Sequence, residues 1–513
     1  MEKSIVFIIT VLVFLNVYLF TDEDRILYSK YKNKKSITCS GNLLERLAVE
    51  VNRYPNLKTI HLKSYRRQVT EVLGKFKNIE HLTITNGFTG SSGLSLPESI
   101  GQLTKLQFLD LSNCRLSKLP ETIGGLTELR EVYLNDNNLR KLPKGVGKWS
   151  KVENIRLDHN QLIKLPPEVG AWTALEEIEL HTNFLLGLPE EIAAWKKISQ
   201  LILTDNRLAS LPNSIGELKE LITLDVSYNE LKTLPSSLVQ LTKLEKLFLE
   251  HNRLDSLPVI AENWKLDKLR YLNLNNNSLK QLPNKIGSLV SLELLDLTSN
   301  RLEQLPNEIG QLKKLEHLNL SKNKLKEISS TIGGLSNLKV LNLKFNELNA
   351  LPVELFTLSK LDYLNISHNK LESLPADIGQ LQNIEELYLQ SNALKNLPAT
   401  IRNLQVLRKI NLSNNQLTQL PESIGKLSLL NSLNLGKNKL TSLPKTIKQL
   451  RNLEYLTILD NDLESFPSSL YELKWLKRLS LGQNKIEELY TQGEYYDIID
   501  VIKRELKYTS VEY

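Results

Sequence analysis

The sequence contains little cysteine and few aromatic side chains, and these two shortages limit how the chain can be cross-linked and which residues can fill its core. Of its 513 residues, two are cysteine and 6% are aromatic. Cys39 and Cys114 fall about three repeat turns apart, roughly 15 Å at the strand spacing of a sheet, which is too far for a disulfide. We therefore expect a chain without a disulfide, whose core is filled by leucine and isoleucine.

Signatures of catalysis and of nucleic-acid binding are also missing. The sequence contains no phosphate-binding glycine loop, no H-E-x-x-H motif and no CxxC pair. Once the repeats are assigned, about 53 residues remain in front of them and about 23 behind, whereas an independent catalytic domain usually needs roughly 50 to 250. The net charge of +7 is small for the length, and nucleic acid requires Lys and Arg concentrated on one face. We expect no enzyme, no catalytic residue, no cofactor and no nucleic-acid partner.

What the sequence does contain is a repeat of 23 residues. Its clearest copy is Leu420–Ser442, and its skeleton reads L-P-x-x-I-G-x-L-x-x-L-x-x-L-x-L-x-x-N-x-L. Cys114 replaces the Asn one period before the first complete copy, and two less regular turns precede it, which makes 19 turns. A fixed period of this length dictates a stacked architecture. The Asn positions follow at steps of 23, with one step of 25 before Asn277: Asn137, Asn160, Asn183, Asn206, Asn229, Asn252, Asn277, Asn300, Asn323, Asn346, Asn369, Asn392, Asn415, Asn438, Asn461 and Asn484.

The residue types within the repeat predict where each part of a turn lies. In L-x-L the two leucines point inward and the x residues outward, as the alternation of a strand requires. The Asn amide offers donors and an acceptor to backbone groups where the chain leaves the strand. Proline then opens a return segment of short helical turns, in which we expect Trp149, Trp172 and Trp195 to pack in the outer layer. Because one turn cannot bury its own apolar edges, neighbours must stack. We predict an α/β solenoid with a parallel sheet.

These motifs resemble those of leucine-rich repeat proteins. The L-P-x-x-I-G-x-L form, over roughly Asn56 to Tyr490, is similar to plant intracellular Ras-group-related, SHOC-2-like and Scribble-type repeats, and we interpret the chain as a bacterial member of this class. The resemblance implies a curved horseshoe with a parallel concave β-sheet and short helical or 3-10 convex segments. It also implies protein partners on the concave side, often in small-GTPase or phosphatase signalling, and no catalytic domain.

The sequence divides into four predicted segments. Residues 56–490 hold the repeats, residues 22–55 a linker and an N-terminal helical cap, and residues 491–513 a C-terminal helical cap. Residues 1–21 contain an apolar run at 5–20 that suits a signal peptide or an N-terminal membrane anchor. A basic residue precedes this run and acidic residues follow it, so the positive-inside bias predicts an extracytoplasmic protein, secreted or tethered to the membrane. The alternative is a cytoplasmic protein.

The outward strand positions are the ones that can recognise a partner. They lie 6, 4, 2 and 1 residues before each Asn, and they are mainly acidic in the first half of the repeats and mildly basic in the second. Aromatic and histidine side chains join the acidic half, and aromatic anchors are what a binding hot spot requires. We expect the centre at Tyr228, Phe248, His251 and Tyr271. The predicted partner-binding residues are Tyr133, Arg156, His159, Glu179, His181, Asp205, Tyr228, Phe248, His251 and Tyr271.

The sequence also contains residues that could bind a metal. Asp158, His159, His181 and Asp205 fall close together on adjacent predicted strands, where His and Asp can converge on a metal. Because their spacing follows from the repeat alone, the sequence assigns no metal ligand.

The predicted function is a non-enzymatic protein–protein interaction module that acts in extracytoplasmic adhesion or recognition. An intracellular signalling scaffold is the alternative. Carbohydrate binding by the Asn- and Tyr-rich second half is a weaker third interpretation.

Overall fold

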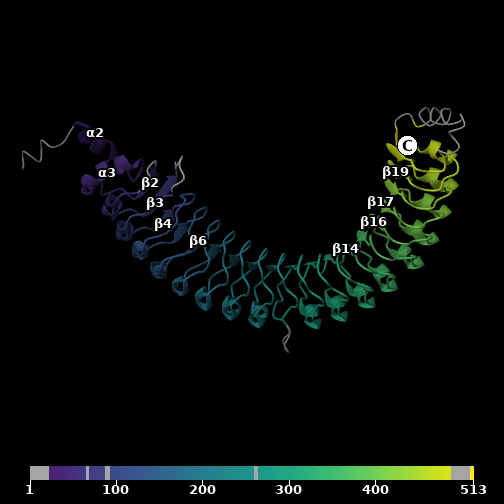
Figure 1. Cartoon of the computed structure of the whole chain (residues 1–513), viewed down its shortest axis with the longest axis horizontal. Coiled ribbons are helices and arrows are strands. Elements are labelled where there is room, and N and C mark those ends of the chain that lie inside the picture. The colour runs from purple at the N-terminus through teal and green to yellow at the C-terminus, as the bar shows by residue number, and fades with distance from the viewer. Residues whose placement is uncertain are drawn as a thin grey trace, which may run out of the picture. The chain divides into compact units, whose positions relative to one another are not determined.

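The chain forms two compact units, Met1–Glu230 (unit 1) and Leu231–Tyr513 (unit 2). The structure, a computed structural model, describes residues 22–64, 69–86, 93–258, 264–486, 506 and 509–512. Within each unit the strands line the inner side of a bend and the short 3-10 segments line the outer side (Figure 1). We name these two sides of each unit the strand face and the return face.

Unit 1 begins with two helices and continues as alternating strands and 3-10 segments. Helices α2 (Asp22–Tyr31) and α3 (Gly41–Val49) flank the first strand, β1 (Ser36–Cys39). Each strand from β1 to β9 pairs in parallel with the next. The further strands are β2 (Thr59–Ser64), β3 (His81–Asn86), β4 (Phe108–Asp110), β5 (Glu131–Tyr133), β6 (Asn154–Arg156), β7 (Glu177–Glu179), β8 (Gln200–Ile202) and β9 (Thr223–Asp225). The 3-10 segments are η1 (Val51–Arg53), η2 (Glu71–Lys75), η3 (Glu98–Gln102), η4 (Glu121–Gly125), η5 (Lys144–Lys148), η6 (Pro167–Ala171), η7 (Glu190–Ala194) and η8 (Asn213–Glu217).

Unit 2 continues the same alternation. Its strands also pair in parallel, each with the next. They are β10 (Lys246–Phe248), β11 (Tyr271–Asn273), β12 (Leu294–Asp296), β13 (His317–Asn319), β14 (Val340–Asn342), β15 (Tyr363–Asn365), β16 (Glu386–Tyr388), β17 (Lys409–Asn411), β18 (Ser432–Asn434), β19 (Tyr455–Thr457), β20 (Arg478–Ser480) and β21 (Ser510–Glu512). The 3-10 segments are η9 (Ser236–Gln240), η10 (Asn284–Ser288), η11 (Asn307–Gln311), η12 (Ser330–Gly334), η13 (Val353–Thr357), η14 (Ala376–Gln380), η15 (Ala399–Asn403), η16 (Glu422–Lys426), η17 (Lys445–Gln449) and η18 (Ser468–Glu472).

The predicted fold class is therefore confirmed as a solenoid with a parallel sheet and short 3-10 return segments. Two observations extend the predicted segment boundaries. Strand β1 lies inside the stretch predicted as a linker and cap, and β21 extends the sheet beyond the predicted last turn. Most of the predicted C-terminal helix lies outside the described residues, so that cap stays a prediction.

The Asn ladder joins neighbouring turns through backbone groups that would otherwise be unpaired. In the turn of Asn160, the side-chain Oδ1 accepts the Leu139 N–H of the preceding turn at 2.9 Å. The Nδ2 group donates to the carbonyl oxygens of Leu134 at 2.9 Å and Leu157 at 3.1 Å. The same pattern repeats along the ladder, for example at Asn300. An unpaired buried backbone group costs about 1–3 kcal/mol, so each Asn stabilises two adjacent turns.

The residue before each Asn adopts a left-handed backbone conformation, which the sequence did not predict. These positions have φ between 51° and 59° although none of them is glycine. They include the β-branched Thr182 (φ 54°) and the aromatic Tyr228 (φ 52°), residue types for which this conformation is unusual. The turn geometry at the end of every strand imposes this conformation regardless of the side chain.

Three tryptophans stack in successive turns on the return face of unit 1. Trp149, Trp172 and Trp195 are fully buried, and their ring centroids are 6.2 and 6.1 Å apart in nearly parallel planes. Each indole N–H donates to a backbone carbonyl of the preceding turn, as Trp172 does to Val146 at 2.8 Å. The prediction that these residues pack in the outer layer is confirmed.

The predicted localisation is corrected. The sequence predicted an extracytoplasmic protein, secreted or anchored by its N-terminal apolar segment. Within the described part of the chain, no helix is long and apolar enough to cross a membrane. The two α-helices there have 10 and 9 residues, about half of the roughly 20 that a bilayer requires. The apolar run at residues 5–20 lies outside the described residues. The extracytoplasmic assignment is therefore withdrawn.

Candidate functional site

The strand face of unit 1 brings five of the ten predicted partner-binding residues into one patch. The parallel register aligns Tyr133 with Arg156, and Arg156 with Glu179. Because adjacent strands lie about 4.8 Å apart, these three side chains form one row across β5, β6 and β7. A second row follows where β6 and β7 end. The β5–β7 patch comprises both rows: Tyr133, Arg156, Asp158, His159, Glu179 and His181.

The first row is joined by Arg156, whose guanidinium lies between the Tyr133 ring and the Glu179 carboxylate. The Arg156 guanidinium carbon lies 5.7 Å from the centre of the Tyr133 ring, and its Nη2 lies 3.3 Å from Glu179 Oε1. The Tyr133 hydroxyl donates to Glu131 at 3.1 Å, and Phe108 packs edge-on against the Tyr133 ring at 5.4 Å. Burial, together with the bond to the Glu131 carboxylate, raises the pKa of Tyr133. The row is a preorganised surface with a partly exposed guanidinium at its centre.

The second row is a cluster of one carboxylate and two imidazoles. Asp158 Oδ2 lies 3.0 Å from His159 Nδ1 and 3.6 Å from His181 Nε2. His181 Nε2 is also 3.7 Å from Glu179 Oε2, and its Nδ1 is 3.3 Å from Thr182 Oγ1. The two imidazole rings meet edge to face at 4.9 Å. Nitrogen and oxygen atoms that bind metals therefore converge at this point.

Two further predicted residues of unit 1 lie outside the patch. Asp205 is exposed in the turn after β8, and its backbone N–H donates to the Ser227 carbonyl oxygen at 3.1 Å. Among the described residues, the cluster of potential metal ligands consists of Asp158, His159 and His181, and Asp205 is not part of it. Tyr228 follows β9 with about half of its side chain exposed.

The remaining predicted residues, Phe248, His251 and Tyr271, belong to unit 2. The Tyr271 ring has Lys246 Nζ at 5.8 Å and the Arg270 guanidinium carbon at 5.4 Å. The His251 Nε2 lies 3.1 Å from Asn276 Nδ2. The predicted centre is thus divided between the two units, and it stays a prediction.

Sequence reasoning missed an exposed apolar cluster next to the patch. Ile163, Phe184 and Leu186 are each 41–57% exposed, and the Arg207 guanidinium lies 4.5 Å over the Phe184 ring. The signal was available, because Ile163 and Leu186 stand three residues after the repeat Asn, where many other turns carry a charged residue.

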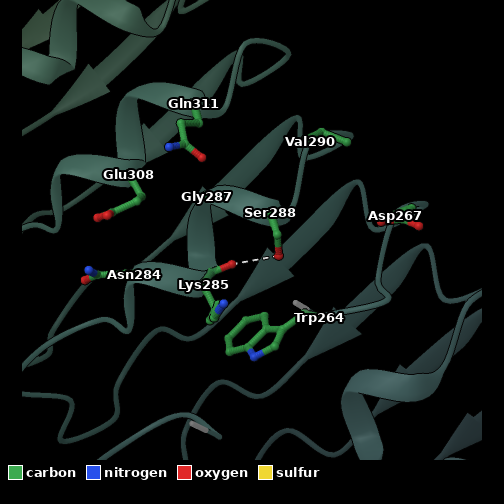
Figure 2. A pocket seen from close by; sticks show the side chains of 9 residues that line it. All are labelled: Trp264, Asp267, Asn284, Lys285, Gly287, Ser288, Val290, Glu308 and Gln311. Atoms are coloured by element: carbon green, nitrogen blue, oxygen red, sulfur yellow. Dashed lines mark hydrogen bonds between the residues drawn. The ribbon is translucent and has the colours of Figure 1, made fainter. Parts of the chain in front are cut away.

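A cavity of about 700 Å³ lies on the return face of unit 2 (Figure 2). Trp264 forms one wall, and segments η10 and η11 supply Lys285, Ser288 and Glu308. The Ser288 hydroxyl donates to the Lys285 carbonyl at 2.8 Å. Among the described residues, the buried Trp264 indole N–H has no hydrogen-bond partner. Residues 259–263, directly before Trp264, lie outside the described part of the chain, so we assign no ligand to this cavity.

Comparison with family models and solved structures agrees with this architecture. A model described as "Leucine-rich repeat region" matches residues 57–193, 259–343 and 399–492, and a second, "Leucine rich repeat", matches residues 196–254 and 336–394. No curated protein matches the chain.

Three solved structures illustrate the range of similar proteins. A leucine-rich-repeat protein of Leptospira interrogans is 31% identical, with 94% of this chain and all of that one covered and a TM-score of 0.56. The plant peptide hormone receptor RGFR1 in complex with RGF2 is 25% identical (85% and 76% covered, TM-score 0.66). The Arabidopsis receptor kinase HAESA, in complex with the peptide hormone IDA and the co-receptor SERK1, is 26% identical (88% and 81% covered, TM-score 0.60).

Proposed function

The chain belongs to the leucine-rich repeat family, and we propose that it is a protein–protein interaction module that binds a protein partner through the strand face of unit 1. The β5–β7 patch is the centre of this surface. The proposal rests on the outward side chains of the strands, because the inward ones are committed to the core. Family membership supports an interaction module and gives no support for a catalytic role.

The observation that carries the proposal is the row formed by Tyr133, Arg156 and Glu179. Tyr and Arg are enriched among the residues that dominate binding energy. The Arg156 side chain is 52% exposed, and its neighbours already hold it in place. A partner therefore gains contacts with a guanidinium whose conformational freedom is reduced before binding, which lowers the entropic cost of association.

The charge of this surface favours a basic partner. At the outward positions from β4 to the turn after β9, acidic residues greatly outnumber the one basic residue, Arg156. Complementary charge speeds association and selects among partners. We therefore propose that the partner presents Lys and Arg to this face, and that added salt weakens the complex. The acidic positions are Asp110, Glu131, Asp136, Asp158, Glu177, Glu179, Asp205 and Asp225.

The similar structures support a polypeptide partner. Two of them are plant receptors in complex with peptide hormones. The likeness to the Leptospira protein, together with the L-P-x-x-I-G-x-L repeats, supports placing this chain in that repeat class and in a bacterium.

Site-specific photocrosslinking tests the proposed face. The photoreactive amino acid p-benzoylphenylalanine replaces Tyr133 on the strand face or, as a matched control, the exposed Thr127 between η4 and β5. After irradiation in cells that make the protein, mass spectrometry identifies the adducts. We expect a protein adduct from position 133 that competes with excess unlabelled chain and is absent from position 127. The proposal fails if position 133 gives no such adduct or if position 127 gives the same one.

A further inference from the structure

We propose that Asp158, His159 and His181 form a binding site for a divalent transition metal of the zinc class, a site that does not depend on the partner-binding proposal. The three residues lie where β6 and β7 end, on the strand face of unit 1. Each residue offers one ligand atom, and these atoms lie within 4.8 Å of one another.

The distances suit a tetrahedral ion. Zinc binds imidazole nitrogen and carboxylate oxygen at about 2.0–2.2 Å, which places neighbouring ligand atoms about 3.3 Å apart. Asp158 Oδ2 lies 3.0 Å from His159 Nδ1 and 3.6 Å from His181 Nε2, on either side of that value. The His159 side chain is 49% exposed, so its ring can adjust and the ion has a route from solvent.

The Asp158 carboxylate provides an independent indication of a ligand. Asp158 is only 6% exposed, and among the described residues its Oδ1 atom has no hydrogen-bond partner. A buried carboxylate oxygen without a partner costs about 1–3 kcal/mol or more. A divalent cation bound at Oδ2 would offset part of that cost, because its positive charge stabilises the whole carboxylate group.

The contact of the other His181 ring nitrogen, Nδ1, orients the imidazole as a metal ligand. Its Nδ1 lies 3.3 Å from Thr182 Oγ1. When Nδ1–H donates to that hydroxyl, the lone pair of Nε2 faces Asp158 Oδ2 and Glu179 Oε2, at 3.6 and 3.7 Å. In that tautomer a cation at this point is attracted by the Nε2 lone pair and by both carboxylate oxygens. Such outer hydrogen bonds orient metal-binding imidazoles in general.

The backbone holds the ligands in place before a metal binds. The His159 N–H donates to the His181 carbonyl at 3.0 Å and joins the two turns. The amides of Asn160 and Asn183 donate to the carbonyls of Asp158 and His181 at 3.2 and 3.3 Å. The ladder therefore fixes the main chain of the ligand residues, which is the preorganisation that a metal site requires.

The metal class follows from the ligand atoms. Two imidazole nitrogens and one carboxylate oxygen, from His159, His181 and Asp158, suit Zn²⁺ or Co²⁺, whereas Mg²⁺ and Ca²⁺ prefer oxygen alone. Three protein ligands leave the fourth tetrahedral position to a water molecule.

Calorimetric titration of the full-length chain tests the site. After treatment with a chelator and dialysis, the protein is titrated with ZnCl₂ and, separately, with MgCl₂, and Co²⁺ absorption in the visible range reports a four-coordinate site. We expect one Zn²⁺ per chain, no Mg²⁺ binding, and at least about tenfold weaker Zn²⁺ binding for His159→Asn and for His181→Ala. The control His317→Ala, an exposed histidine on β13 of unit 2, should bind as the native chain does.

His159→Asn decides the outcome if His181→Ala does not fold. Asparagine tolerates the left-handed conformation at this position, and an unchanged circular dichroism spectrum and urea midpoint verify that the variant is folded. Failure of the native chain to bind Zn²⁺ overturns the proposal. Equal Zn²⁺ affinity of His159→Asn and His317→Ala overturns it as well.

Discussion

Replacement of Asn300 by alanine should show how much of the stability of unit 2 depends on one rung of the Asn ladder. The Asn300 side chain is 8% exposed. Its Oδ1 accepts the Leu279 N–H at 3.0 Å, and its Nδ2 donates to the carbonyls of Leu274 at 2.9 Å, Leu297 at 3.1 Å and Thr298 at 3.3 Å. Two of these bonds reach the preceding turn, so the substitution loosens two turns at once.

The expected cost follows from the groups left behind. A typical neutral hydrogen bond contributes about 0.5–1.5 kcal/mol, and a buried donor left without a partner costs about 1–3 kcal/mol. The Leu279 N–H becomes such a donor, and the Leu274 carbonyl loses its bond to the amide. We expect Asn300→Ala to lower the free energy of unfolding by roughly 2–4 kcal/mol. In a repeat protein this loss is concentrated in the neighbouring turns.

Hydrogen exchange followed by mass spectrometry measures the effect locally. Exchange at the Leu279 amide should become at least about 30-fold faster, since 1.4 kcal/mol corresponds to a factor of ten. Asn284→Ala serves as the matched control, because Asn284 is exposed at the start of η10. The reasoning is refuted if Leu279 exchanges at the native rate in Asn300→Ala, or if both variants have the same urea midpoint.

Three further predictions concern other parts of the fold. Trp172→Phe removes the indole donor to the Val146 carbonyl and should cost roughly 1–3 kcal/mol in urea unfolding; an unchanged midpoint would mean that the bond contributes nothing. Burial raises the pKa of Cys39 to about 11 and of Cys114 to about 12, so neither thiol should react with Ellman's reagent at pH 8 until guanidinium unfolds the chain. These folded pKa values exceed the unfolded value of about 8.5. The stabilisation from the two buried, protonated thiols should therefore be fully present below pH 8.5 and be lost progressively between pH 9 and 11. A urea midpoint that does not fall over this range would contradict the burial. Ser299→Gly, at φ 54°, should raise stability by roughly 0.5–1 kcal/mol, because glycine adopts the left-handed conformation without strain; lower thermal stability would refute this.

The fold could be predicted in detail because the residues that specify it recur. Asn at steps of 23 gave the register of the turns, and L-x-L gave the strands with their buried leucines. The left-handed residue before each Asn could not be predicted, because that position holds Asp, His, Thr, Tyr or Lys in different turns. The hydrogen bonds of the turn impose this conformation, so the residue type at the position does not predict it.

The candidate site was less predictable, since no packing requirement acts on the outward positions. Tyr133, Arg156 and Glu179 stand at the same repeat position, four residues before Asn137, Asn160 and Asn183, and the structure aligns them in one row. The burial of Asp158 could not be predicted, because a charged aspartate at an outward position is expected to face water, whereas the structure leaves it only 6% exposed beside the His159 and His181 imidazoles. The predicted centre at Tyr228 and Tyr271 stays a prediction, because these residues belong to different units.

The affinity of the crosslinked partner for variants of the β5–β7 patch tests the central proposal most directly. With the purified partner, biolayer interferometry compares Arg156→Ala with Lys197→Ala, a control at an exposed lysine between η7 and β8. The account predicts at least about a tenfold loss of affinity, roughly 1.4 kcal/mol, for Arg156→Ala and native affinity for Lys197→Ala. Equal affinities of the two variants would contradict the assignment of the strand face of unit 1 as the binding surface.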